Sequence, residues 1–301
     1  MVKILSLISI LTAPVFIFST IVKVKAFFAG RKGAPFFQPY YDLIKLFKKQ
    51  ITISKDTSII FILGTIVTLT ASIMTLLFIP IIANDSFFSF NGDIIFVAYM
   101  MALGRFFMVL AALDTGSSFE GMGSAREATF SMLSEPALFL ALMAIVGKSG
   151  LISFENSFAQ ISPNLWMTSG IGFLLIAVAL FIIILVENSR IPIDDPNTHL
   201  ELTMIHEVMI LDHSGPLLGI MEISALLKMF AFISIIVHVV FPFNFNNILA
   251  NFLFYYFGML TVAVVIGIIE STMARIKLKK IPTFQIIVVV LAGIGMFLTL
   301  E

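Results

Sequence analysis

The chain has 301 residues, of which 59% are hydrophobic and 12% charged, and its mean hydropathy is +1.07. Soluble domains average about 45–50% apolar and about 25% charged residues, so the composition excludes a soluble globular protein and predicts one polytopic, all-α membrane domain over residues 1–301. A formal net charge of zero gives no sign of nucleic-acid binding, and the absence of cysteine excludes thiolate-ligated iron–sulfur clusters within the chain.

Apolar runs long enough to cross a bilayer recur along the chain, since about 20 helical residues match a hydrocarbon core of about 30 Å. The first run could pass for a signal peptide. It is long enough to span, lacks a small-x-small cleavage pattern and is followed directly by Lys23 and Lys25, so we expect a retained helix. We predict about eight transmembrane helices, at 4–22, 58–82, 93–113, 127–147, 166–186, 216–241, 249–270 and 282–300.

Basic residues are concentrated in alternate connections. They are dense at 23–55 and at 275–280, and they recur as Arg126 and Arg190, while Arg105 lies inside the third apolar run. The opposite connections carry few, with Lys148 the main exception. The positive-inside rule therefore places the basic loops in the cytoplasm and both termini on the outer side.

A short segment at about 38–50 has helical periodicity but cannot span. Its apolar residues recur at i, i+3, i+4 and i+7 from Tyr40 to Phe47, and the other face carries Asp42, Lys45, Lys48 and Lys49. This pattern is typical of an amphipathic helix lying in the cytoplasmic membrane interface. An ordinary solvated linker is the alternative.

Two acids lie within apolar runs. Glu135 follows the start of the fourth run by about two turns, and Glu222 lies in the sixth, six residues before Lys228. An ionised carboxylate at mid-bilayer costs roughly 2.5 kcal/mol or more, so such residues usually face a wet cavity or a partner. The alternatives are an interfacial position for Glu135 beside a simple kink at Pro136, and a structural pair of Glu222 with Lys228.

The segment 187–215 gathers an unusual share of the titratable groups, six of the 18 acids and three of the four histidines. Pro192 and Pro196 forbid a regular helix, which predicts a stiff cytoplasmic loop at about 187–199. A helix is expected to restart near Asn197 or Thr198 and to run to about His213. Its histidines would then share one side, at positions His199, His206 and His213.

Three interpretations of that segment are open. Metal or haem ligation by the histidines has little support, because His206 and Glu207 lack the second histidine of an HExxH site. A solvated surface helix is the second. The third is a proton-handling funnel of carboxylates and imidazoles with shifted pKa values, which requires Glu135, Glu187 and Glu222 to converge on one cavity.

Three stretches of the sequence resemble the membrane-anchor subunit of group 4 NiFe hydrogenases, a family that includes formate hydrogenlyase, hydrogenase-4 and energy-converting hydrogenases. They are GRKGAPFFQPYYDLIKLFKKQ (30–50), GSSFEGMGSAREATFSMLSEPALF (116–139) and ENSRIPIDDPNTHLELTMIHEVMILDHSGP (187–216). This family is homologous to the heel subunit of respiratory complex I, whose pattern E-x-x-R-x-P-x-D-x-P followed by a further Glu is matched by Glu187, Arg190, Pro192, Asp194, Pro196 and Glu201.

The resemblance implies eight transmembrane helices, an interfacial helix after the first, and a cytoplasmic face that docks soluble subunits. It implies no cofactor or metal in this chain, with iron–sulfur clusters and the NiFe centre in partner subunits. The implied partners are the hydrogenase large and small subunits, an iron–sulfur subunit and antiporter-like membrane subunits, in a prokaryotic cytoplasmic (inner) membrane. Glu135, Glu187, Glu201 and Glu222 fall where the family has its acidic funnel, whereas the spacing leaves Glu207 and Asp212 less certain.

We therefore expect a redox-inactive, non-catalytic subunit that anchors a hydrogenase arm and couples electron transfer to proton or sodium movement. The alternatives are the quinone-chamber subunit of a complex I, a stand-alone cation transporter and a purely structural anchor. The expected coupling residues are Glu135, Glu187, Glu201, Glu222, Glu207, Asp212, His199, His206, His213 and Lys228. The expected docking residues are Arg31, Lys32, Arg190, Asp194 and Asp195.

Overall fold

The computed structural model describes residues 2–82, 84–147, 150–194, 204–242, 245 and 247–300. Within these ranges the chain is helical, with no β-strand and one isolated antiparallel bridge between Ile82 and Asp85. The helices are α1 (Val2–Phe28), α2 (Gln38–Phe47), α3 (Ile59–Phe78), α4 (Asp93–Asp114), α5 (Ser118–Val146), α6 (Phe154–Gln160), α7 (Pro163–Glu187), α8 (His206–Met209), α9 (Gly215–Val240), α10 (Ile248–Thr272), the 3₁₀ turn η1 (Leu278–Lys280) and α11 (Ile281–Leu300).

Eight of these helices are long and apolar enough to cross a membrane, which confirms the predicted number. They are α1, α3, α4, α5, α7, α9, α10 and the continuous stretch of η1 and α11. The boundaries differ where local chemistry decides them. The second span ends at Phe78 rather than 82, because the residue before Pro80 is disfavoured in the helical region. The fourth begins at Ser118, nine residues early, and carries Glu120 in its first turn.

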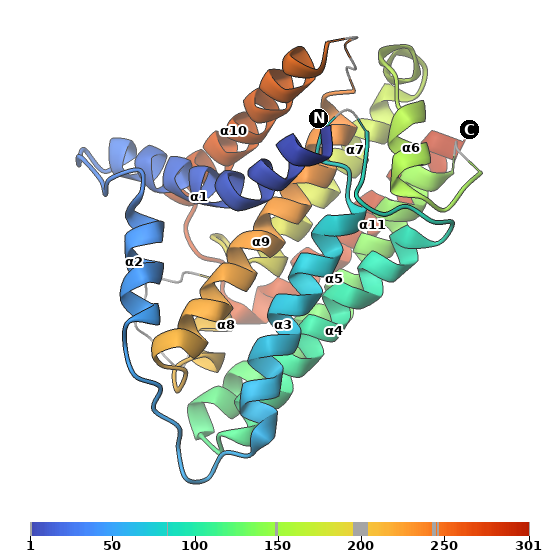
Figure 1. Cartoon of the computed structure of the whole chain (residues 1–301). Coiled ribbons are helices and arrows are strands. Elements are labelled where there is room, and N and C mark those ends of the chain that lie inside the picture. Colours follow the sequence, from blue (N-terminus) through green and yellow to red (C-terminus); the bar gives the residue numbers. More distant parts are fainter. Residues whose placement is uncertain are drawn as a thin grey trace.

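The spans form one bundle around α9, the most buried of the eight (Figure 1). α3 packs along α4, α11 lies between α5 and α7, and α1 crosses α10. Glycines allow the closest approaches: a Cβ on Gly267 of α10 would lie 2.8 Å from the Val24 side chain of α1. Both termini lie toward the end of the bundle that carries α6 (Figure 1). Which end faces the cytoplasm stays a prediction.

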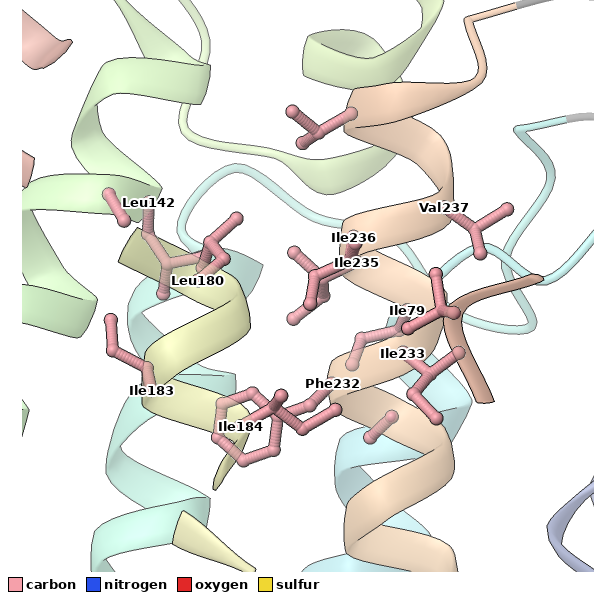
Figure 2. Close-up of a cluster of buried hydrophobic side chains, with 14 of the residues drawn as sticks. Ile79, Leu142, Leu180, Ile183, Ile184, Phe232, Ile233, Ile235, Ile236 and Val237 are labelled. Atoms are coloured by element: carbon pink, nitrogen blue, oxygen red, sulfur yellow. The ribbon is translucent and has the colours of Figure 1, made fainter. Parts of the chain in front are cut away.

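The core consists of apolar side chains packed against one another. Figure 2 shows Leu180 and Ile184 of α7 facing Phe232 and Ile236 of α9, with Ile79 from the end of α3 beside them. These side chains are all less than 4% exposed. Burial of this kind fixes the spacing between α7 and α9, and it therefore positions the polar end of α7 that follows Leu185.

The amphipathic segment does form a helix, α2, which begins at the Gln38–Pro39 step and packs beside α1 and α9. The Tyr40 hydroxyl donates a 2.7 Å hydrogen bond to the carbonyl oxygen of Leu11 in α1. Tyr41, Ile44 and Phe47 remain exposed. Its location in the cytoplasmic membrane interface stays a prediction.

The sequence predicts a continuous helix from about 198 to His213. This prediction is wrong over residues 204–213, where only α8 (His206–Met209) is helical. Tertiary contacts override the helical pattern there. Asp194 Oδ2 accepts the backbone N–H of Ile205 at 2.8 Å and so fixes where α8 starts. Further along, Ser214 Oγ accepts the N–H of Thr52 at 2.9 Å, which ties the segment to the stretch after α2. His206 and His213 therefore do not share a helical face, and His199 lies outside the described residues.

Candidate functional site

Arg105 of α4 is the centre of a buried ion cluster. Its Nη1 lies 2.7 Å from Glu135 Oε1, its Nε lies 3.4 Å from Glu127 Oε1, and its Nη2 donates to Glu187 Oε2. Glu127 and Glu135 belong to α5 and Glu187 ends α7, so one guanidinium joins three spans. The Arg105 side chain is only 6% exposed, and a charge so deeply buried persists only when it is paired.

Glu187 extends the cluster to a fourth span. Lys228 Nζ of α9 lies 2.9 Å from Glu187 Oε2 and donates to the Glu187 backbone carbonyl at 2.7 Å, and Ser134 Oγ donates to Oε1 at 2.8 Å. Lys228 thus pairs with Glu187, whereas a structural pair with Glu222 was the alternative expectation. The cluster combines two cations with three carboxylates. When all are ionised it carries one excess negative charge, and one bound proton neutralises it.

A cavity of about 550 Å³ lies beside this cluster. Its wall is formed by α1, α2, α3, α4, α8, α9 and the turn that follows α7. The funnel hypothesis requires Glu135, Glu187 and Glu222 to converge on one cavity. Glu187 and Glu222 line this one, whereas Glu135 does not and instead contacts Arg105, which does. The charged and imidazole side chains in the wall are Lys25, Asp42, Lys45, Lys49, Arg105, Glu187, Arg190, His206, Glu207, Glu222 and Lys228.

A second cavity of about 10 Å³, roughly the size of one water molecule, lies between Glu127, Ser131, Ser134 and Glu187. It therefore opens between two carboxylates of the same cluster.

His206 and Glu207 of α8 face the large cavity, and both have shifted pKa values. Burial, together with the positive charges of Lys228 and Arg190, lowers the pKa of His206 to about 4. Burial raises the pKa of Glu207, the Asp194 carboxylate adds to that rise, and Arg190 opposes it. At neutral pH His206 is therefore neutral, which excludes it as a permanent cation and leaves it able to accept a hydrogen bond.

The remaining predicted coupling residues lie apart from the cluster or outside the described range. The Asp212 N–H donates to Glu120 Oε1 of α5 at 2.9 Å. His213 is 4% exposed and stacks on Phe61 of α3, with ring centroids 4.2 Å apart. Glu201 and His199 lie outside the described residues, as does Asp195 of the predicted docking loop.

Of the predicted docking residues, Arg31 and Lys32 are exposed in the connection between α1 and α2. Arg190 and Asp194 instead make internal contacts. Arg190 Nη1 lies 3.4 Å from Glu270 of α10, and Asp194 Oδ1 lies 2.9 Å from Arg275. Their docking role stays a prediction. Their ion pairs attach the loop to α10 and to the residues that follow it.

Sequence reasoning missed three important members of these ion pairs. Arg105 was noted only as a basic residue within a span, and neither Glu127 nor Glu270 was selected. A usable signal existed for Arg105 and Glu135, because opposite charges in consecutive apolar runs are expensive apart and so favour pairing. Glu127 lies in a polar stretch at the start of its run, and its burial depends on α4 and α7.

The described residues contain no group of three or more histidines or carboxylates arranged to hold a metal ion. The candidate site consists of the ion pairs around Arg105 and the two cavities beside them. It is suited to binding and releasing protons, because each carboxylate of the cluster can change charge while the others and the two cations hold its place.

A bundle of eight apolar spans that encloses an ion cluster beside a cavity defines a multi-pass membrane protein with a charged interior. The model of the family described as NADH dehydrogenase matches residues 2–300, and the chain belongs to that family. A solved structure of the membrane-bound sulfane sulfur reductase, an archaeal respiratory membrane complex, contains a chain with the same fold. The two share 23% identity with a TM-score of 0.84 over 99% of each chain.

Two curated relatives are from Escherichia coli strain K12. Hydrogenase-4 component C is 30% identical over 262 residues, covering 84% of this chain and 81% of the relative. Formate hydrogenlyase subunit 4 is 27% identical over 260 residues, covering 84% and 83%. One subunit of the NADH-quinone oxidoreductase of Orientia tsutsugamushi strain Boryong is 32% identical over 177 residues, 57% of this chain and 48% of the relative. The chain is thus homologous to membrane subunits of both hydrogenase-type and complex I-type assemblies.

Proposed function

We propose that this chain is the redox-inactive membrane subunit of a multisubunit hydrogenase complex, in which it anchors the soluble arm and couples electron transfer to ion movement. The observation that carries the proposal is the Arg105 cluster. It joins four spans, it borders the cavity, and its Glu187 directly precedes the loop at 188–194. The names of the two E. coli relatives support the hydrogenase branch.

The proposed mechanism is electrostatic. A charge change in the docked arm alters the potential at the cavity wall and shifts the proton between the three carboxylates of the cluster. The cluster then passes the change laterally to ion-translocating subunits. In this proposal the iron–sulfur clusters and the NiFe centre reside in the partner subunits, and the whole assembly lies in a prokaryotic cytoplasmic membrane. The matched relatives are components of complexes, which favours an assembly over a stand-alone transporter.

The test is Glu135→Gln in the assembled complex, with product formation and ion uptake measured together in vesicles. Glu135 is the most exposed carboxylate of the cluster, at 41%, and its replacement leaves Arg105 paired with Glu127 and Glu187. We expect the ratio of ions moved to product formed to fall about tenfold, the scale of a typical coupling free energy between sites. Glu155→Gln in α6 is the matched control, because Glu155 lies outside the cluster and contacts Ser86. An unchanged ratio for Glu135→Gln would refute the proposal.

The quinone chamber of a complex I is the second candidate, and the cavity favours it, because about 550 Å³ lies within the size range of small-molecule sites. A quinone-site inhibitor added to the purified complex separates the two functions. Inhibition of turnover favours the complex I branch, and hydrogen production that is insensitive to the inhibitor favours the hydrogenase branch.

A further inference from the structure

A second ion cluster borders the same cavity, and none of the functions above uses it. Glu270 of α10 has a side chain that is only 1% exposed, and it pairs with two cations. Lys25 Nζ of α1 lies 2.8 Å from Glu270 Oε2, and Arg190 Nη1 lies 3.4 Å from Oε1. Lys25 and Arg190 line the cavity, so the carboxylate holds both cations at its wall.

Arg190 is held on several sides. Its guanidinium carbon lies 5.3 Å from the centroid of the Phe18 ring of α1, and its Nη2 lies 3.6 Å from the sulfur of Met229 in α9. Its own backbone N–H donates to the Leu185 carbonyl at 2.8 Å, which closes the turn at the end of α7. Arg190 therefore connects α1, α9 and α10 to the turn that contains Glu187.

The extension of α10 is attached to the same loop at two more points. The Ile276 N–H donates to the Pro192 carbonyl at 2.8 Å, and Arg275 Nη2 lies 2.9 Å from Asp194 Oδ1. Three contacts thus run between residues 270–276 and residues 190–194. The turn 187–190 has the Arg105 cluster at its first residue and the Glu270 cluster at its last.

We infer that Glu270 is a positioning residue that holds Arg190 at the cavity wall and so joins the turn 187–190 to the end of α10. The inference rests on the proposed coupling function of the Arg105 cluster and extends it to the Glu270 ion pairs. A movement or charge change at Glu187 is transmitted through three residues to Arg190. The cation of Arg190 in turn sets the potential that the cavity carboxylates experience.

The charges facing each carboxylate decide the sign of the test. Glu270 faces Lys25 from α1 and Arg190 from the loop, and Glu187 faces Arg105 from α4, Lys228 from α9 and Glu127 from α5. Glu270→Gln adds one net positive charge to the wall. This favours the ionised form of the cavity carboxylates and moves the pH profile of ion uptake to lower pH. Lys25→Met removes one positive charge, so the profile moves to higher pH.

The experiment uses the purified complex in lipid nanodiscs for hydrogen exchange and in vesicles for ion uptake. In Glu270→Gln we expect about tenfold faster exchange of the amides of residues 188–194, since a local contact worth about 1.4 kcal/mol is lost. We also expect the shift to lower pH described above. Glu270→Asp keeps the charge and should retain the wild-type profile. The double variant Glu270→Gln with Lys25→Met should return the profile toward wild type while exchange stays fast.

Unchanged exchange at 188–194 in Glu270→Gln would overturn the inference. Faster exchange with an unshifted pH profile would overturn it as well, because Glu270 would then be structural only. If Glu270→Gln fails to assemble, the upward shift expected for Lys25→Met still decides the electrostatic part, and no shift there refutes it. Failure of the proposed coupling function appears separately, as an unchanged ion-to-product ratio in Glu135→Gln with the exchange result intact.

Discussion

At the scale of single residues, Arg105 explains why three carboxylates can lie together inside an apolar bundle. The two more deeply buried carboxylates, Glu127 and Glu187, each carry a desolvation penalty of several kcal/mol, which only close cations and hydrogen bonds offset. Glu127, Glu135 and Glu187 share the guanidinium, and Glu187 has Lys228 in addition. Because the carboxylates exceed the cations by one, a single bound proton brings the cluster to zero net charge.

His213 carries the clearest pH dependence outside the spans. Burial against Phe61 lowers its pKa to about 4 from 6.5, so the folded segment holds fewer protons than the unfolded one between these values. The stabilisation is complete above pH 6.5 and is lost as the pH falls toward 4. The loss amounts to about 1.4 kcal/mol per pH unit within that window.

We predict that His213→Phe, which keeps an aromatic ring against Phe61 and removes the titration, weakens this dependence. The measurement is amide exchange of residues 204–214 at about pH 7.5 and about pH 5.5, corrected for intrinsic exchange, because local opening reports local stability. Between the two, protection in the wild type should fall by about 1 kcal/mol more than in the variant. Equal losses in both proteins would show that His213 does not titrate in this window.

Among the site residues, the sequence identified the acids whose unfavourable position in or at the end of an apolar run can be recognised without knowing their partners. Glu135 and Glu222 lie in apolar runs and Glu187 ends one, so hydropathy alone selects them. The role of Arg105 could not be predicted in the same way, because its partners come from α5 and α7 and become neighbours only on folding. Glu270 lies near the end of its span, where an acid is ordinary in sequence, and its burial follows from the crossing of α1 and α10.

At the scale of elements, the spans were predictable because a bilayer imposes both length and hydropathy on each helix. The segment 204–215 was not, because contacts distant in sequence decide its conformation. Asp194 starts α8, Glu120 accepts the Asp212 N–H, and Ser214 bonds to Thr52. Helical periodicity carries no information about such contacts.

Gly215, at the start of α9, gives a direct test of this segment. Its φ of +54° is in the left-handed region, and a Cβ there would lie 2.6 Å from the Gln50 carbonyl oxygen. We predict that Gly215→Ala destabilises the junction by about 1–3 kcal/mol, the usual cost of a strained backbone conformation. The measurement is the rate of proteolysis in the connection between α2 and α3, which Gly215 contacts.

The matched control for that prediction is Gly121→Ala in α5, where a Cβ meets no atom within 4 Å. Alanine in a helix interior is favoured over glycine by about 1 kcal/mol, so this variant should be neutral or slightly stabilising. Proteolysis of Gly215→Ala at the rate of the control would show that the junction tolerates a side chain.

At the scale of the whole molecule, the bundle has two interiors with opposite properties. One is the dry packing between α7 and α9 in Figure 2, and the other is the cavity bordered by both ion clusters. α9 contributes to each, with Met221 and Lys228 at the cavity and Ala231 and Phe232 in the dry core. Proton coupling requires the cavity to be hydrated, because proton transfer between cavity residues that are not hydrogen-bonded to each other needs bridging water.

The absence of cysteine from the chain allows this requirement to be tested on one helix. Ala225 lines the cavity and Ala231, six residues later, is completely buried in the dry core. Because a thiol reacts through its thiolate, which forms readily only in water, we predict that Ala225→Cys reacts with a small hydrophilic maleimide at least about tenfold faster than Ala231→Cys. Peptide mass spectrometry of the labelled complex locates the adduct on this chain. Equally slow reaction at both positions would mean that the cavity excludes water, and the carboxylates of the Arg105 cluster would then have no aqueous route for exchanging protons.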